Sequence, residues 1–360
     1  MTGLSGHAGG WHIKQKPLQG LLGTGGGGAF GGTAPVAPTP IQWIVIAGGG
    51  GGGFDAGGSG GAGGYLTGTT PGEIEAGDSL SVTVGAGGAG NDGTPNTPTG
   101  RNGVNGSNSV FDNPYNTITC IGGGGAGGGG PVQIGSPGGS GGGSRRNYTV
   151  PGSDARGTPA PGSPAPERQG YPGGPTSNGP QASPGGGGAG GAGDAGSAGE
   201  GGPGGVGVLN PLMPTTNNGY VAGGGGGGVD GPTMAIGKAA NMPMGSPANG
   251  YGGSPGGGGG PQNPNSEWFK TENAIANTGG GGGGGGGNPA PESSPYYPNP
   301  VPVNRTGGTG GPGVVILVVP DAHGFSVAPT VTMSAGYALP GSKLGYKFSA
   351  GTGSIDLEGA

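Results

Sequence analysis

The chain has 360 residues, of which 109 are glycine and 38 are proline, and its formal net charge is −5. Only 29% of the residues are hydrophobic, against about 45–50% in ordinary globular domains, which excludes a large aliphatic core. The mild negative charge argues against nucleic-acid binding as the main role. No run of about 20 apolar residues is present, so no membrane insertion is expected. Charged residues make up only 8%, fewer than disordered chains usually carry, so we expect an ordered protein.

Short apolar segments rich in β-branched residues are predicted to form strands. Residues 41–47 and 117–121 each lead directly into glycine, and residues 80–84 alternate with period two, which indicates one buried face. Glycine or proline interrupts almost every window long enough for a helix, so essentially no α-helix is expected. The predicted strands are residues 41–47, 80–84, 109–111, 117–121, 220–222, 314–319, 330–334, 344–349 and 354–358.

The strands and glycine runs suggest three parts. Residues 1–40 form a lead segment, residues 41–320 a glycine-rich body, and residues 321–360 a small C-terminal β segment. The body begins and ends with its two most apolar strands, which we expect to pair and to clamp the glycine-rich material between them. The start of the chain shows no ordinary signal peptide, and the single cysteine, Cys120, excludes an intrachain disulfide framework.

The glycine runs are the main structural question, because each fixed glycine costs more backbone entropy than any other residue. Collagen requires glycine at every third position over many repeats, and this pattern fails at Val208. Flexible linkers are a second option. The third is a bundle of polyglycine II helices, whose outward amides and carbonyls bond to neighbouring helices. The similar lengths of the runs favour the bundle. They occupy residues 48–53, 122–130, 185–193, 223–228, 256–260 and 279–287.

The fold expected from the sequence is therefore mostly irregular and β, with short strands clamping a bundle of polyglycine II helices. Long segments rich in proline, asparagine, serine and aromatic residues separate the runs. On a rigid bundle we expect them to be gathered at its ends as presenting loops. These segments are residues 91–109, 144–183, 208–219, 229–249, 261–278 and 288–306.

The order of these elements resembles the glycine-rich domain of bacteriophage tail proteins and tail fibres, over residues 41–320. The resemblance rests on "GGAGGY" (60–65), "DSLSVTVGAGGAG" (78–90), "NGSNSVF" (105–111), "ITCIGGGGAGGGG" (118–130) and "GGPGVVILVV" (310–319). The expected scaffold is also similar to the polyglycine II domain of phage fibre-tip adhesins, in which distal loops contact the host. The family often has a strand ahead of the first apolar strand. Here a comparable "YKFSAGTGSIDL" (346–357) lies near the C-terminus, where it would pair with the first strand or with another subunit.

The resemblance implies a non-enzymatic structural protein of a virion, made in the host cytoplasm and built into a tail fibre or its tip. Its partners would be other virion proteins, a bacterial cell-surface glycan or protein, and further copies of itself, a trimer being one option. A head fibre or capsid decoration protein without a receptor role is the alternative. An ice-binding protein is a third hypothesis, because regular glycine-rich bundles can present flat faces.

No motif for catalysis, metal or cofactor binding is recognised. The glycines after residue 47 lack the helix that a dinucleotide loop needs, and Lys238 is followed by alanine rather than by the serine or threonine of a P-loop. The three histidines have no cysteine partners for a zinc site. We therefore expect no enzyme activity, no metal and no cofactor.

Aromatic and charged residues in the segments between runs are the binding candidates. Rigid aromatic side chains on loops suit stacking on sugars or filling a partner's pocket. The alternative is that each aromatic residue caps the end of the glycine bundle. The candidates for receptor or partner binding are Trp268, Phe269, Lys270, Tyr296, Tyr297, Arg145, Arg146 and Tyr148. The candidates for attachment to the virion, in the lead segment, are Trp11, Ile13, Lys14, Lys16, Leu18, Leu21 and Leu22.

Overall fold

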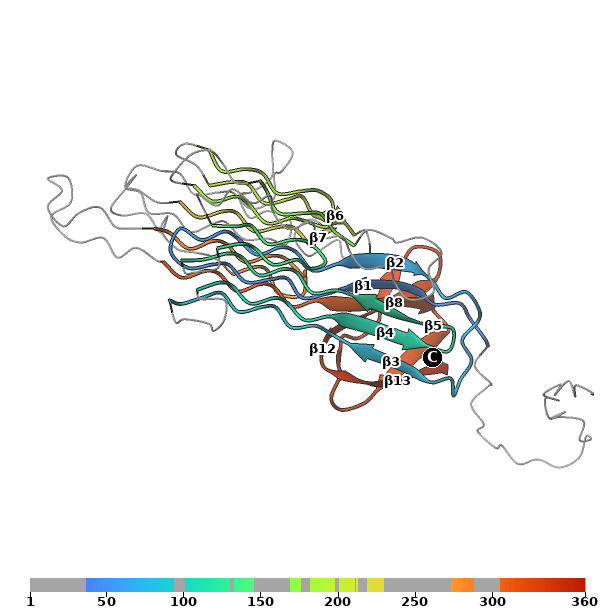
Figure 1. The fold of residues 1–360 in the computed structure, drawn as a ribbon. Helices are drawn as coiled ribbons and strands as arrows, with labels where there is room; N and C mark the ends of the chain where they lie inside the picture. The colour runs from blue at the N-terminus through green and yellow to red at the C-terminus, as the bar shows by residue number, and fades with distance from the viewer. Residues whose placement is uncertain are drawn as a thin grey trace, which may run out of the picture. The chain divides into compact units, whose positions relative to one another are not determined.

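The computed structural model describes residues 37–93, 101–129, 133–145, 169–175, 182–197, 201–210, 212, 219–229, 273–287 and 305–359. These ranges lie in one compact unit, Pro35–Ala360. As expected, they contain short antiparallel strands, β1 to β13, and no α-helix (Figure 1).

The first sheet has the strand order β10-β12-β8-β1-β2, with β11 also paired to β12. At its centre β1 (Gln42–Ile46) pairs antiparallel with β8 (Val314–Pro320), with Ile44 opposite Ile316. The expected pairing between the first and last strands of the body is therefore confirmed. The remaining strands of this sheet are β2 (Tyr65–Thr69), β10 (Thr332–Met333), β11 (Tyr337–Leu339) and β12 (Lys343–Ala350).

The second sheet has the order β5-β4-β3-β13-β9, again with antiparallel neighbours, and β6 and β7 form a separate pair. The strands of the second sheet are β3 (Leu80–Thr83), β4 (Ser109–Asn113), β5 (Asn116–Cys120), β9 (His323–Val327) and β13 (Thr352–Gly359). The separate pair consists of β6 (Val208–Leu209) and β7 (Tyr220–Val221).

The central strands β1 and β8 are buried on both faces. Val45 lies in the apolar core that also contains Phe111 of the second sheet. Ile44 and Ile316 belong instead to a second cluster, which includes Val221 of β7. Strands covered on both sides lose the alternation of apolar and polar residues, which explains the uninterrupted apolar sequence of β8.

The C-terminal residues supply strands to both sheets. β12 pairs with β8, and β13 lies between β3 and β9. The segment that was expected to pair with the first strand or with another subunit therefore pairs within the chain, and β8 separates β12 from β1 (Figure 1).

Every strand predicted from the sequence is present in the described ranges, with small differences in its ends. Sequence reasoning missed β2, β6, β9 and β11. β2 contains Gly68 and two threonines, and β9 contains Gly324, so neither has an uninterrupted apolar pattern. Their pairing with a long neighbouring strand compensates for their weak local signal.

Glycine-rich segments continue the strands beyond one end of the two sheets (Figure 1). β1 continues into residues 47–53, β5 continues into residues 121–129, and residues 306–313 lead into β8. The sheets thus determine which glycine segments become neighbours.

Two buried side chains join the sheets at this junction. The Ser109 hydroxyl accepts a hydrogen bond from the Gly85 amide (2.9 Å) and donates one to the Ile46 carbonyl (2.8 Å). The Cys120 thiol donates to the Val45 carbonyl. Beyond this junction no side chains lie between the neighbouring glycine-rich segments, and their backbones form hydrogen bonds directly with one another.

Residues 48–53 are buried and lie at the centre of the glycine-rich part. Their amides bond in a repeat of three, so that every third amide donates to the same flanking segment. A β-strand instead directs its amides alternately to two sides, so this repeat is not a sheet pattern. Gly48 and Gly51 donate to Ser107 and Val104, Gly49 and Gly52 to Gly311 and Gly308, and Gly50 and Gly53 to Gly61 and Gly58.

The carbonyls of the same run accept hydrogen bonds from three further segments, again with a repeat of three. The central run is thus hydrogen-bonded on all sides to six surrounding segments. Gly49 and Gly52 accept from Gly88 and Asn91, Gly48 and Gly51 from Gly123 and Ala126, and Gly50 and Gly53 from Gly282 and Gly285.

These segments approach too closely for side chains. A Cβ added to Gly50 would overlap the carbonyl oxygen of Gly124, and one added to Gly53 would overlap that of Gly127. The overlapped atoms belong to backbone, so they cannot move aside as the end of a side chain can. The absence of side chains is therefore what permits this packing.

Three expectations about the glycine body were wrong. Residues 169–174 were expected in the presenting loop 144–183, but the amides of Tyr171 and Gly174 donate to the carbonyls of Gly188 and Gly185 in the bundle. Residues 101–108 form an outer segment of the bundle rather than a presenting loop, because their amides and carbonyls bond to neighbouring glycine-rich segments. The run at residues 185–193 is not one rod. It bends near Gly190, and the amide of Gly185 bonds to the carbonyl of Asp194 on the returning segment.

Candidate functional site

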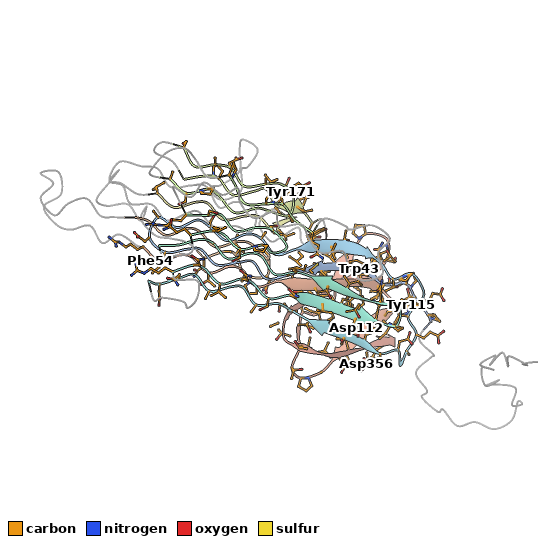
Figure 2. All side chains as sticks on the ribbon, viewed as in Figure 1. Trp43, Phe54, Asp112, Tyr115, Tyr171 and Asp356 are labelled. Carbon is orange, nitrogen blue, oxygen red and sulfur yellow. The ribbon has the colours of Figure 1, made fainter. Side chains whose placement is uncertain are left out.

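The end of the glycine body farthest from the sheets is organised by a turn at residues 54–56. Figure 2 shows Phe54 at this end, with Trp43 and Tyr115 on the sheet part. Asp55 and Ala56 have positive φ values of 59° and 50°, which side-chain-bearing residues seldom adopt. The turn reverses the central run so that residues 57–64 return toward β2.

Several far-apart segments meet at this turn. Phe54 donates its amide to the Arg101 carbonyl and accepts from the Gly129 amide. Asp55 donates to the Arg305 carbonyl, and Ala56 donates to the Gly286 carbonyl. The Ser183 hydroxyl donates to the Ala56 carbonyl. These partners come from five segments that are far apart in the sequence, and the turn joins them at one end of the glycine body.

An ion pair fastens the turn to one of these segments. Arg145 donates from Nη2 to Asp55 Oδ2 (3.1 Å) and from Nε to the Asp55 carbonyl (3.0 Å). The two side chains are only 17% and 20% exposed, so bulk solvent screens the pair incompletely. The residues before and after the turn are thereby held at a defined position relative to residue 145.

Arg101 makes a cation–π contact with Phe54 at this end. Its guanidinium carbon lies 5.1 Å from the centre of the Phe54 ring, within the range of a cation–π interaction. The Gly93 α-carbon lies against the same ring. Both side chains are half-buried, so the ring and the guanidinium are accessible from outside the bundle.

A ladder of three asparagines completes the bundle on another side. Asn102, Asn105 and Asn108 are spaced by three residues, and their side-chain Oδ1 atoms accept hydrogen bonds from the amides of Gly128, Gly125 and Gly122 at 2.7–2.9 Å. These amides face a side on which no further glycine segment lies among the described residues. The asparagine side chains replace the carbonyls that such a segment would supply.

The opposite end of the described unit contains the start of the described chain. His323 Nε2 lies 2.7 Å from the Ala37 carbonyl, and the Tyr346 hydroxyl donates to the His323 carbonyl. Tyr115 also lies at this end, where its hydroxyl donates to the Glu73 carbonyl (Figure 2). The chain thus enters at the sheet end, and its central run first turns at the far end.

Two half-buried tyrosines, Tyr65 and Tyr337, have raised pKa values. Burial, followed by an electrostatic contribution from the neighbouring Cys120, raises the pKa of Tyr65 above its ordinary value of 10.0, and a hydrogen bond with Thr67 opposes this. Burial also raises the pKa of Tyr337. Tyr337 donates its hydroxyl to the Leu212 carbonyl at 2.9 Å.

Of the binding residues predicted from the sequence, the structure places Arg145, in the ion pair with Asp55. The other receptor-binding candidates, Trp268, Phe269, Lys270, Tyr296, Tyr297, Arg146 and Tyr148, lie outside the described residues. So do all the attachment candidates of the lead segment: Trp11, Ile13, Lys14, Lys16, Leu18, Leu21 and Leu22.

The described ranges hold no group of three or more His, Cys, Asp or Glu side chains arranged as metal ligands. They also contain no helix of the length and apolarity needed to span a membrane.

Sequence reasoning missed the residues that organise the far end, Phe54, Asp55 and Arg101, and it missed the asparagine ladder. A signal for the ladder is present, because asparagine recurs at every third position in "RNGVNGSN" (101–108). No comparable local signal marks Asp55, whose partner is 90 residues away.

Comparisons with known proteins give one match. Searches of curated proteins and of solved structures found no significant similarity. A family model described as a glycine-rich domain matches residues 24–320, which is most of the chain. The chain therefore belongs to this glycine-rich domain family.

Proposed function

We propose that this chain is a non-enzymatic structural protein of a bacteriophage virion, a component of a tail fibre or of its tip. Its glycine-rich body would be a rigid scaffold, and the segments that leave the far end of that body would contact the bacterial surface. Membership of the glycine-rich domain family and the resemblance to phage tail proteins support this proposal.

We further propose that the glycine runs are polyglycine II helices. Such a helix has three residues per turn and rises about 3.1 Å per residue. The repeat of three in the hydrogen bonds of residues 48–53 supports this assignment, as does the bonding of that run to neighbours on all sides. A helix without internal hydrogen bonds needs neighbours of this kind to satisfy its backbone.

The observation that carries the functional proposal is that segments far apart in the sequence meet at the turn of residues 54–56. Arg101, Gly129, Gly286 and Arg305 all bond to this turn, and each lies close to a segment of the sequence rich in polar, proline or aromatic residues. A rigid body with many connections at one end is suited to present several loops to one partner. Binding loops on a rigid scaffold also lose less entropy when they bind.

In this proposal the two ends have different tasks. Residues 1–40, with Trp11, Lys14 and Leu18 among the attachment candidates, would join other virion proteins at the sheet end. Trp268, Phe269 and Lys270 would belong to the surface that contacts a glycan or protein of the host. Copies of the chain would assemble with one another in the fibre.

The test is adsorption of virions assembled with altered chains. Replacing Trp268, Phe269 and Lys270 together by alanine should reduce or redirect adsorption without reducing incorporation into particles. Tyr115→Ala, at the sheet end, is the matched control and should leave adsorption unchanged. Unaltered adsorption and host range for the triple variant would contradict the receptor role and favour a head fibre or decoration protein.

Attachment is tested separately. Deleting residues 1–40 should leave a folded body that no longer enters particles. Normal incorporation of the shortened chain would contradict the assignment of this segment as the anchor.

A further inference from the structure

The arginines of the described ranges are gathered at the far end of the glycine body. Arg101, Arg145 and Arg305 all bond to the turn of residues 54–56. The carbonyls of Arg101 and Arg305 accept from the consecutive amides of Phe54 and Asp55, so the two arginines lie on either side of the turn. The lysines of the described ranges both belong to β12, on the sheet part. Guanidinium groups are therefore a feature of this one end.

Carboxylates are distributed the other way. On the sheet part they outnumber the two lysines, and Asp112, Asp356 and Glu358 are exposed on strands of the second sheet (Figure 2). In the described glycine body the carboxylates are Asp55, which is paired with Arg145, and those of Asp92 and Asp194. The sheet part therefore repels an approaching anion, whereas the far end does not.

The Arg101 side chain makes no hydrogen bond or ion pair with another residue of the described ranges. Its guanidinium carbon instead lies over the Phe54 ring, 5.1 Å from the ring centre. A guanidinium carries five N–H donors, and a contact with the face of a ring gives these donors no conventional acceptor. Arg101 is also half-buried rather than fully covered. Its donors are therefore available to an acceptor that comes from outside the protein.

The surroundings of this guanidinium are fixed by the bundle. The Arg101 carbonyl accepts from the Phe54 amide at 3.1 Å, and Asn102, the next residue, accepts through Oδ1 from the Gly128 amide at 2.8 Å. Gly93 packs against the Phe54 ring so closely that a Cβ there would meet the ring. Because the backbone of Arg101 and the ring beneath its guanidinium are both held, less side-chain entropy is lost when a ligand binds.

Lys347 in β12 shows what distinguishes Arg101. It is likewise half-buried, and its ammonium group has no hydrogen bond or ion pair with the part of the chain that the structure describes. No aromatic ring holds this ammonium group there, and it lies on the part of the molecule where carboxylates predominate. Arg101 combines an unpaired cation, a ring that holds it and a position between other arginines.

We propose that Arg101, held over Phe54, binds an oxyanion carried by a saccharide of the bacterial surface. This inference rests on the proposed function and names the chemistry of the contact at the far end. A planar guanidinium suits a carboxylate or a phosphate, because two of its N–H groups can donate in parallel to two oxygens. The carboxylate of a uronic acid and the phosphate of a phosphorylated sugar are the two sources of such an oxyanion.

The test is calorimetric titration of the full chain at low salt. The anionic probes are a hexamer of galacturonic acid and maltohexaose that carries a phosphate, and unmodified maltohexaose is the neutral probe. The wild-type chain should bind an anionic probe and not the neutral one, and the probe that binds identifies the source of the oxyanion. Arg101→Gln should weaken this binding by about tenfold or more, because the hydrogen bonds to a charged group are lost.

Further variants separate the geometry of the site from its charge and from folding. Arg101→Lys keeps the charge without the planar fork and should bind more weakly than wild type but better than Arg101→Gln. Phe54→Leu should also weaken binding, because the guanidinium loses its ring. Lys347→Gln is the matched control and should bind as wild type does. Arg101→Gln keeps the carbonyl that accepts from Phe54, so its thermal unfolding midpoint should equal that of wild type.

Three results would overturn the site. They are wild-type binding of neither anionic probe, equal binding of the neutral probe, and unchanged binding by Arg101→Gln. The titration uses no virions, so anion binding can hold even where the adsorption test of the proposed function fails. Conversely, virions that carry Arg101→Gln and adsorb as wild type does would overturn this site and leave the proposed function standing.

Discussion

The α-carbon of Gly51 faces the carbonyl oxygen of Ala89 so closely that any Cβ on Gly51 would overlap it. Gly48, three residues earlier, faces the carbonyl oxygen of Ala86 in the same way. The two segments thus stay in contact at every third residue. Repeated backbone contacts of this kind explain how a chain with few apolar residues forms an ordered body. The stability of this glycine body comes from backbone hydrogen bonds and close backbone contact, and conventional apolar clusters lie only on the two faces of β1 and β8.

Gly51→Ala should destabilise the glycine body although it adds only one methyl group. The added methyl group meets backbone on a neighbouring segment, and overpacking of this kind costs about 1–3 kcal/mol. Thermal or denaturant unfolding measures the loss. Ala86→Ser adds one atom at an exposed position of an adjacent segment and should be nearly neutral. Equal stability of the two variants would contradict the close packing.

Asn105→Ala should weaken the side of the bundle that the asparagine ladder completes. The substitution leaves the amide of Gly125 without its acceptor, at a cost of about 1 kcal/mol. Hydrogen exchange should report faster exchange at Gly125, with little change at Gly123, whose acceptor is the Gly48 carbonyl. Val104→Ala, at the neighbouring exposed position, is the control. Unchanged exchange at Gly125 would show that water replaces the side chain without loss.

Asp55→Asn should retain the turn but remove the ionic part of the contact with Arg145. Asparagine tolerates the positive φ of this position, so the backbone need not change. We expect a loss of about 0.5–1 kcal/mol at low salt, because the pair is partly shielded from solvent. The difference from wild type should shrink at high salt. A difference that does not depend on salt would mean that the ion pair contributes nothing measurable.

The half-buried tyrosines Tyr65 and Tyr337 predict a loss of stability in alkali. Because burial raises the pKa of Tyr65 and Tyr337 above 10.0, the unfolded chain loses these protons first as the pH rises. The contribution of these two groups to the free energy of unfolding should therefore be constant well below pH 10 and should fall as the pH rises from 10 toward the folded pKa. Tyr65→Phe should reduce this slope in a denaturant titration repeated over pH. Asn105→Ala should lower stability at every pH without altering the slope, and an unchanged slope for Tyr65→Phe would contradict the assignment.

Much of the sheet architecture could be predicted, because its signals are local. The apolar segments that became β1 and β8 are rich in β-branched residues, and their pairing follows from their places at the two ends of the body. β9 and β11 could not be predicted, because their sequences alone favour no strand and their positions depend on β13 and β12. The insertion of β13 beside β3 is likewise a pairing between residues far apart in sequence.

The far end of the body was harder to anticipate. A glycine run by itself gives no information about its neighbours, since each run has the same composition. The positions of the runs follow from the sheets that they extend, and those positions bring Asp55 to Arg145. The asparagine ladder was predictable in principle from its spacing. Its meaning depends on knowing that residues 101–108 lie at the edge of the bundle.

The most direct test of the account is hydrogen exchange at residues 48–53, resolved to single residues in the full chain. If these glycines are packed and hydrogen-bonded to six neighbouring segments, their amides should be protected from exchange about as strongly as those of β1 and β8. This protection should be lost in the same unfolding transition as that of the two strands. Exchange at the rate of an unstructured glycine chain, with β1 and β8 still protected, would contradict the packed scaffold and leave the runs as linkers.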